Sequence, residues 1–216
     1  QYQMGRVALQ QGKLGTALAC FQPLALSAPA AVADEAQLAI LTVYLTQHDT
    51  VMARALMSAL HATHDKATPL AARLAYYDAL LALEDGNGDV AQQRCRDVIA
   101  NAPLTSEAFE AHILLADLED RVGHIGETTR LLKELLAIER LPRAHRANVA
   151  KRLGDLARRA QDYVEAIRWY DEASALWPMV RDETRYLSAS CAEEAGDVEV
   201  ALHGYQALTH APWRVR

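Results

Sequence analysis

The distribution of apolar and polar positions along this chain favours helices over strands. No run alternates apolar and polar residues for long, and Ala, Leu, Glu, Arg and Gln fill the segments between breaks. These residue types have high intrinsic helix propensity, and only 10 Gly and 7 Pro interrupt them. The pattern predicts an all-α protein.

A pattern of small, aromatic and proline residues recurs along the chain. Its clearest copy contains Gly154, Ala166, Tyr170 and Pro178. Small side chains let two helices approach closely, so we expect Gly154 and Ala166 to lie where a first helix packs against a second. The proline lies where the second helix must already have ended.

The start of the second helix in this copy has its own signal. Asp162 can cap the helix, and Glu165 three residues later can reach back to complete a capping box. Tyr163, Tyr170 and Leu176 are then expected to fill the space between neighbouring helix pairs.

Other segments repeat the same order of residues. A spacing of twelve residues separates the small residue of the second helix from the closing proline in three copies, which are Ala17 to Pro29, Ala91 to Pro103 and Ala166 to Pro178. The last copy, from Ala201 to Pro212, is one residue shorter. Two units are weaker: one has Thr128 and a late Pro142, and the other is inferred from Ala39, Ala53 and Met57 without a glycine near Gln47 and His48.

These residues resemble the tetratricopeptide repeat over nearly the whole chain, although the family's first-helix Trp is absent and the average period is nearer 37 than 34 residues. The resemblance implies an all-α, right-handed superhelical solenoid of about six antiparallel helix pairs. It implies one domain over 1–216, with approximate repeats 1–31, 32–68, 69–104, 105–142, 143–178 and 179–216. Because both ends look unfinished, at Gln1-Tyr2 and at Trp213 to Arg216, we expect flanking repeats or domains of a longer chain.

Composition restricts the class of protein. Hydrophobic residues make up 51% of the 216 residues and charged residues 23%, as in a folded soluble chain and unlike a disordered one. The longest apolar stretches, such as 28–33, fall short of the ~20 residues that a membrane-spanning helix needs. A net charge of −6 gives no reason to expect nucleic-acid binding. Three separated cysteines without a CxxC pair indicate free thiols, which slightly favour the cytoplasm or the cytoplasmic face of a membrane over the periplasm.

Charge is unevenly distributed along the chain. The segment 140–159 contains seven cations and one carboxylate, a net charge of +6, which leaves −12 for the rest. An isolated basic segment in an acidic background would steer an acidic partner to one place. The alternative interpretation is a solvated helix face whose cations are balanced by nearby acids.

Groups that could hold a metal or support catalysis are incomplete. His61 and His64, with Asp65, would offer two nitrogens and one oxygen, too few ligands for zinc. Asp85 to Asp89 imitates the first half of a calcium loop but lacks the Gly and the final Glu that such a loop requires. We expect solvated side chains at the first place and a helix-to-helix turn at the second, with no cofactor, metal or catalytic residue.

The first helices would present a chemically mixed surface if they follow the family's geometry and line a concave groove. The candidate partner-binding residues combine aromatic, apolar and charged side chains, and they are Tyr76, Leu80, Ile113, Asp117, Lys151, Arg152, Asp155, Arg158, Tyr186 and Ser190. The tyrosines have an alternative role in the core between repeats. The family's clamp of Lys and Asn for a chaperone carboxylate is not expected, because Asp155 stands in place of the Asn and would repel that group.

The resulting prediction is a protein-interaction scaffold without enzymatic activity. It would hold a partner segment, preferably acidic, in a larger bacterial or envelope-associated assembly, such as one that exports polysaccharide or protein. Two alternatives stay open: a helical-repeat domain that senses a small effector within a larger regulator, and an α/α-toroid enzyme, which would need several acids in a closed lumen.

Overall fold

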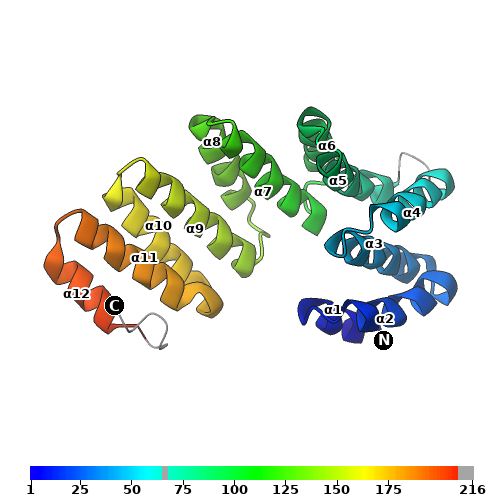
Figure 1. Cartoon of the computed structure of the whole chain (residues 1–216), viewed down its shortest axis with the longest axis horizontal. Coiled ribbons are helices and arrows are strands. Elements are labelled where there is room, and N and C mark those ends of the chain that lie inside the picture. The colour runs from blue at the N-terminus through cyan, green and yellow to red at the C-terminus, as the bar shows by residue number, and fades with distance from the viewer. Residues whose placement is uncertain (65–67, 209–216) are drawn as a thin grey trace. The chain divides into compact units, whose positions relative to one another are not determined.

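The computed structural model describes residues 1–64 and 68–208, which form twelve α-helices and one 3-10 turn (Figure 1). The all-α prediction is confirmed. No helix in these two ranges has the length and hydropathy needed to cross a membrane. The elements are α1 (Tyr2–Gln10), α2 (Leu14–Ser27), α3 (Ala30–Thr46), α4 (Thr50–Thr63), α5 (Pro69–Glu84), α6 (Gly88–Asn101), α7 (Ser106–Arg121), α8 (Ile125–Leu136), α9 (Arg143–Arg159), α10 (Tyr163–Leu176), η1 (Pro178–Val180), α11 (Arg181–Glu194) and α12 (Val198–Gln206).

The helices pack into two compact units, unit 1 (1–111) and unit 2 (112–216), and the division falls inside α7. Unit 1 contains the helix pairs α1–α2, α3–α4 and α5–α6, and unit 2 contains the end of α7 with α8, followed by α9–α10 and α11–α12. In each pair the earlier helix is termed the first helix and the later one the second helix. Five pairs lie within the expected repeat ranges, and α3 begins two residues before its range. The single superhelical domain stays a prediction.

A turn of one conformation joins the two helices of every pair. Its central residue has a left-handed backbone, with φ from 56° to 86°, at Gly12, His48, Gly86, Gly123, Gln161 and Gly196. Around Gln161, its own N–H binds Arg158 O at 2.9 Å and the next N–H binds Ala157 O at 2.9 Å, which satisfies the last carbonyls of the first helix. Glycine adopts this backbone without steric cost, which explains its use in four of these six turns.

The residue after the central residue of each turn is the N-cap of the second helix. Asp162 Oδ1 accepts a hydrogen bond from Glu165 N at 3.1 Å, so the expected cap is confirmed. Asp49 and Asp197 cap α4 and α12 in the same way. The Glu165 carboxylate, expected to reach back, instead accepts from Nε of Arg168 at 2.9 Å.

Close approach within a pair depends on a small residue opposite a large one. A Cβ atom built on Gly154 would lie 2.7 Å from Cε1 of Tyr170, and one built on Gly5 would lie 2.6 Å from Cε1 of Phe21. Both rings are fully buried. The interpretation of Gly154 as a packing position is therefore confirmed, and the absence of a side chain there leaves the space that the ring fills.

Each unit has its own apolar core. In unit 1, one cluster lies among α1, α2 and α3 and another among α3, α4 and α5. In the second pair, Ala53 and Met57 are buried in the cluster of α3, α4 and α5, and Ala39 is half-buried and packs against the cluster of α1, α2 and α3. In unit 2, Tyr170 and Cys191 join α10 to α11. Pro212 lies outside the described residues.

The turn conformation gives a test of stability. Replacing Gln161 by Gly should raise the free energy of unfolding by roughly 0.5–1 kcal/mol, because a non-glycine residue with left-handed backbone is strained. Chemical denaturation measures the change. The neighbouring Ala160→Gly is the control: its φ is −80°, so glycine there should lower stability. Equal effects of the two substitutions would contradict the explanation.

The packing contact gives a second test. Gly154→Ala should lower the free energy of unfolding by about 1–3 kcal/mol, because the new methyl group overlaps the Tyr170 ring. Gly126→Ala on α8 is the matched control, since nothing lies within 4 Å of its added Cβ, and it should be neutral or slightly stabilising. Thermal and urea unfolding of both variants would show the difference. If Gly154→Ala left the free energy of unfolding unchanged, the close packing of Gly154 against Tyr170 would be refuted.

Candidate interaction surface

Helix α9 brings four predicted residues together in unit 2. Lys151, Arg152, Asp155 and Arg158 lie within two turns of this helix, and all four are half-buried. Residues four apart are neighbours on a helix surface, so Lys151 Nζ lies 3.5 Å from Asp155 Oδ2. This cluster forms the centre of the candidate surface.

Ion pairs join α9 to the first helices on both sides of it. Arg152 pairs with Asp117 of α7. On the other side, Lys151 Nζ lies 3.3 Å from Glu183 Oε1 of α11. The α9 cations thus cross-link three consecutive first helices within unit 2.

A further ion pair lies at the C-terminal end of α9. Arg158 Nη2 lies 2.6 Å from Glu194 Oε1 of α11. The hydrogen bond between them raises the pKa of Arg158 and lowers that of Glu194. Glu194 also accepts from the Ser190 hydroxyl at 3.4 Å, so this carboxylate is shared between a predicted cation and a predicted hydroxyl.

Asp155 has a structural partner from the second helix of its own pair. The Tyr170 hydroxyl donates to Asp155 Oδ1 at 2.7 Å. Burial raises the pKa of Tyr170, and the hydrogen bond to Asp155 raises it further. The aspartate that replaces the clamp asparagine therefore positions a tyrosine and a lysine.

A small cavity of about 150 Å³ opens among α7, α8 and α9. Charged side chains from two first helices line it, including Asp117, Asp120, Arg152, Asp155 and Arg159. Arg159 Nη2 lies 2.6 Å from Asp120 Oδ1, so this wall also consists of ion pairs. The cavity offers both donors and acceptors to a polar group.

The remaining predicted residues of unit 2 differ in accessibility. The Tyr186 ring packs at 5.7 Å from the Tyr205 ring, centroid to centroid, and is half-buried. Ser190 is half-buried on the same helix, α11. Ile113 on α7 is only 6% exposed, because its apolar side chain packs into the core. Ile113 therefore supports the surface and offers little area to a partner.

The basic segment 140–159 is not an isolated charge in the structure. Four of its cations, Lys151, Arg152, Arg158 and Arg159, have acidic partners on neighbouring first helices. These pairs agree with the alternative interpretation of the segment, a solvated helix face whose cations are balanced by nearby acids.

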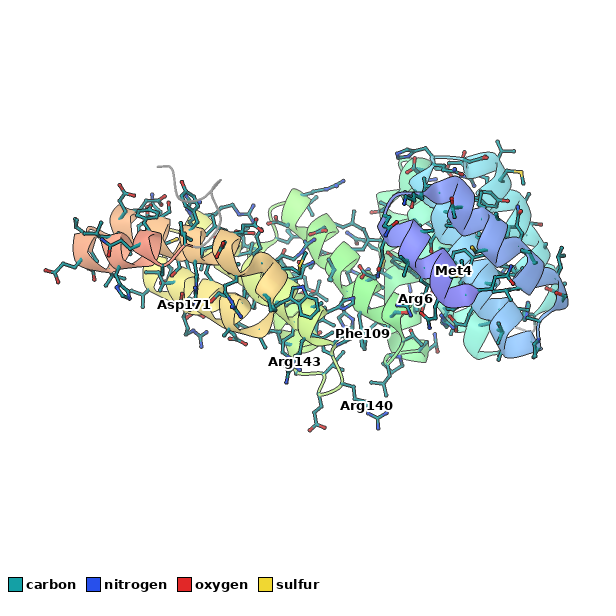
Figure 2. All side chains as sticks on the ribbon, turned by 90° about the horizontal axis from the view of Figure 1, so that it is seen from below. Met4, Arg6, Phe109, Arg140, Arg143 and Asp171 are labelled. Atoms are coloured by element: carbon teal, nitrogen blue, oxygen red, sulfur yellow. The ribbon has the colours of Figure 1, made fainter. Side chains whose placement is uncertain are left out.

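The other three cations of this segment lie near the start of α9. Arg146 donates to the carbonyls of Leu136 and Ile138, each at 2.9 Å, and so caps the end of α8. Arg140 and Arg143 are exposed at the loop edge of unit 2 and form no ion pair with any residue that the structure describes (Figure 2).

Tyr76 and Leu80, the predicted residues of unit 1, lie on α5. Leu80 is half-buried, and the Tyr76 ring lies 5.5 Å from the ring of Tyr77, edge to face. Burial raises the pKa of Tyr76, which packs against the cluster of α3, α4 and α5. The alternative role of Tyr76 in the core between repeats is thus largely what the structure shows.

Sequence reasoning missed a charged triad on the first helices of unit 1. Arg73 Nη2 lies 3.1 Å from Glu35 Oε2 of α3 and 2.8 Å from Glu107 Oε1 of α7. Arg73 Nε also donates to Glu107 Oε2 at 2.9 Å, and Glu107 is buried. The two-pronged contacts use the planar guanidinium to hold two carboxylates at once.

The sequence signal for these pairs is a separation of about one repeat. Arg73 follows Glu35 by 38 residues and precedes Glu107 by 34, and Arg152 follows Asp117 by 35. Opposite charges one period apart on first helices would have indicated them.

The two histidines considered for a metal face different carboxylates. His61 Nε2 lies 3.2 Å from Asp78 of α5, and His64 Nε2 lies 3.4 Å from Asp34 of α3. Asp65 lies outside the described residues. The other considered site, beginning at Asp85, forms the turn between α5 and α6, where Asp85 pairs with Arg54 at 2.6 Å.

Sequence comparison and structural comparison differ in what they find. No family model matches the sequence, and no curated protein is significantly similar to it. Solved structures do match. The Pseudomonas aeruginosa pilF protein has 20% identity and a TM-score of 0.66, over 95% of this chain and 87% of that chain. BtubC (BKLC) from P. vanneervenii has 16% identity and a TM-score of 0.67, over 89% of this chain and 85% of that chain.

A further match is PilW, a widely conserved type IV pilus biogenesis factor, with 15% identity and a TM-score of 0.65, over 95% of this chain and 89% of that chain. The chain has a tetratricopeptide-like fold. The repeat pattern of the sequence and the structural comparison therefore agree on the fold, and identities of 15–20% show the fold alone.

The contact between Tyr170 and Asp155 predicts a pH-dependent stability difference. Tyr170→Phe should cost about 1–3 kcal/mol at pH 8, because a half-buried hydrogen bond to a carboxylate is lost. In the native chain the raised pKa keeps Tyr170 protonated, whereas the unfolded tyrosine ionises near pH ~10. The unmutated protein therefore loses stability above pH ~10, and the Phe variant loses less. The difference in free energy of unfolding between the two proteins, measured by chemical denaturation, should therefore narrow between pH 8 and 11. A difference that stays constant over this pH range would contradict the raised pKa of Tyr170.

Proposed function

We propose that this chain is a non-catalytic scaffold that holds a segment of another protein against its first helices. The tetratricopeptide-like fold supports the scaffold class, and it favours a scaffold over an α/α-toroid enzyme. A place in a bacterial envelope-associated assembly is part of this proposal, since PilW, which has the same fold, is a pilus biogenesis factor.

The observation that carries the proposal is the half-exposed network of ion pairs on α9. Pairs at this level of exposure contribute little stability each, so a partner can exchange them at small cost. Lysine has three N–H donors and arginine five. Donors therefore remain on Lys151 after its two carboxylate contacts, and on Arg152 and Arg158 after one each. An acidic partner segment would engage Lys151, Arg152 and Arg158 in this way.

The size of the cavity beside α9 favours a protein partner over a small effector. Its volume is about 150 Å³, whereas sites for small molecules usually enclose ~300–1,000 Å³. The effector-sensing alternative therefore has less support at this place than the scaffold.

Charge reversal tests the proposal. The triple variant Lys151→Glu, Arg152→Glu and Arg158→Glu should weaken binding of a fluorescein-labelled acidic peptide by at least roughly tenfold, measured by fluorescence anisotropy at low salt. Arg168→Glu is the control, since Arg168 is an exposed, ion-paired arginine on the second helix α10. Circular dichroism must show that all variants stay folded.

A second variant separates partner binding from general repulsion. Asp117→Asn, Glu183→Gln and Glu194→Gln remove the acids that pair with the same cations, and so should strengthen binding of the acidic peptide. If neither triple variant changes the affinity, the α9 cations are not part of the binding surface.

A further inference from the structure

Grooves also lie on the other side of the helix pairs, between consecutive second helices. In each of them a first helix forms the floor. One such groove, among α4, α5 and α6, encloses about 650 Å³, another among α2, α3 and α4 about 450 Å³, and a third among α10, α11 and α12 about 260 Å³. The first two belong to unit 1 and the third to unit 2.

The groove among α2, α3 and α4 differs from the others in its chemistry. No charged side chain lines it, and its lining includes Leu26, Ile40, Tyr44, Met52 and Leu56. We name it the uncharged groove.

The equivalent grooves carry charge at the same place in the repeat. Arg54, Asp78, Asp85 and Arg94 line the groove of α4, α5 and α6. Asp171, labelled in Figure 2, and Arg185 line that of α10, α11 and α12. Charge at this position is therefore compatible with the fold, and its absence distinguishes the uncharged groove from the other two.

Helix α2 has the same peculiarity along its whole length. Leu14–Ser27 contains no Asp, Glu, Lys, Arg or His, whereas each of the other five described second helices contains at least one acid or base. Its surface nevertheless faces solvent: Leu26 is 89% exposed, and Met52 on the opposite wall is 45% exposed. An exposed apolar rim around a groove is typical of a surface that a partner covers.

One polar atom at this groove lacks a hydrogen bond. Gln37 lines the floor, and its Oε1 is shielded from solvent without a partner among the described residues. A shielded carbonyl oxygen without a donor costs free energy, which a donor on an occupant would recover. The groove thus combines apolar walls with one acceptor.

We propose that the uncharged groove is a second interaction site, which takes the apolar face of an amphipathic helix from a partner protein. A third helix packs naturally between two others by fitting its ridges into their grooves. A volume of about 450 Å³ accepts apolar side chains spaced along one helix face, and the flexible Met52 can adapt to their shape. Because no charge lines the groove, the docking face of the partner is uncharged, with one hydroxyl or amide donor for Gln37.

The site is independent of the α9 surface. It lies in unit 1, and its walls are second helices, whereas the surface of the proposed function is built on first helices of unit 2. Each site can therefore fail its own test without affecting the other.

The probe for this site is a labelled model peptide with Leu on one helix face and Gln and Ser elsewhere, compared with a scrambled peptide of the same composition. Fluorescence anisotropy should show saturable binding of the amphipathic peptide to the full chain. Leu26→Arg and Met52→Glu should each weaken it at least roughly tenfold, because a charge would lose its water in the groove. Both side chains are exposed in the free protein, so folding should be unchanged.

Val164→Arg on α10 is the matched control, since Val164 is 81% exposed on another second helix. Binding unaffected by this change, and lost with Leu26→Arg, supports the site. Three results overturn the proposal: no binding of the amphipathic peptide up to about 1 mM, equal binding of the scrambled peptide, or equal affinities of the Leu26→Arg variant and the parent chain.

Two other occupants have distinct outcomes. If the chain self-associates in sedimentation experiments and Leu26→Arg abolishes this while no peptide binds, the groove holds a second copy of the chain. If phosphatidylglycerol vesicles bind through Leu26 and the peptide does not, the surface contacts a membrane. Either result overturns the partner helix.

Discussion

The contact of Tyr170 with Gly154 is the interaction on which the α9 surface depends. The glycine lets α10 approach α9 closely enough for the ring to lie where a Cβ would otherwise stand. At that distance the Tyr170 hydroxyl reaches Asp155, and Asp155 in turn lies beside Lys151, which contacts Glu183 of the next first helix. One missing side chain thus fixes a sequence of contacts from the core of a pair to the charges that join neighbouring pairs.

The charges on first helices have two physical consequences. Opposite charges about one repeat apart hold adjacent first helices in register, as Arg152 does with Asp117 and Arg73 does with Glu35 and Glu107. At the same time they neutralise cations that would otherwise attract any acidic molecule. Because the α9 pairs are half-exposed and individually weak, the proposed partner would exchange them where it offers better geometry.

Local signals made much of the fold predictable from the sequence. Gly154 and Asp162 each have a role that depends on the partner helix or the nearest helix turn, and the structure places them as their residue types indicated. Ala166 is fully buried in the cluster that contains Tyr170. His48 and Gln161 illustrate the limit: both adopt the left-handed turn, but neither is glycine, so their conformation follows from the repeat and not from their own preference.

The candidate surface was less predictable, because its properties depend on neighbouring repeats. The cations of 140–159 look isolated along the chain, and only the register between α7, α9 and α11 shows which acids face them. The burial of Ile113 likewise depends on how α7 is rotated against its neighbours. Residue type identified the helix that carries the charges, but the pairing required the distance between first helices.

The second helices show why α2 stands apart energetically. Second helices such as α8 and α10 carry their own short-range ion pairs, for example Arg130 with Glu127 and Arg168 with Glu165, which support an exposed helix. Helix α2 has none of these and contains Pro23 in its interior, which removes a backbone hydrogen bond. Its stability therefore depends on burying Phe21 against α1 and on whatever covers its outer face. A helix with so little support of its own gains more from an apolar partner than its charged counterparts would, and this links docking in the uncharged groove to the stability of α2 itself.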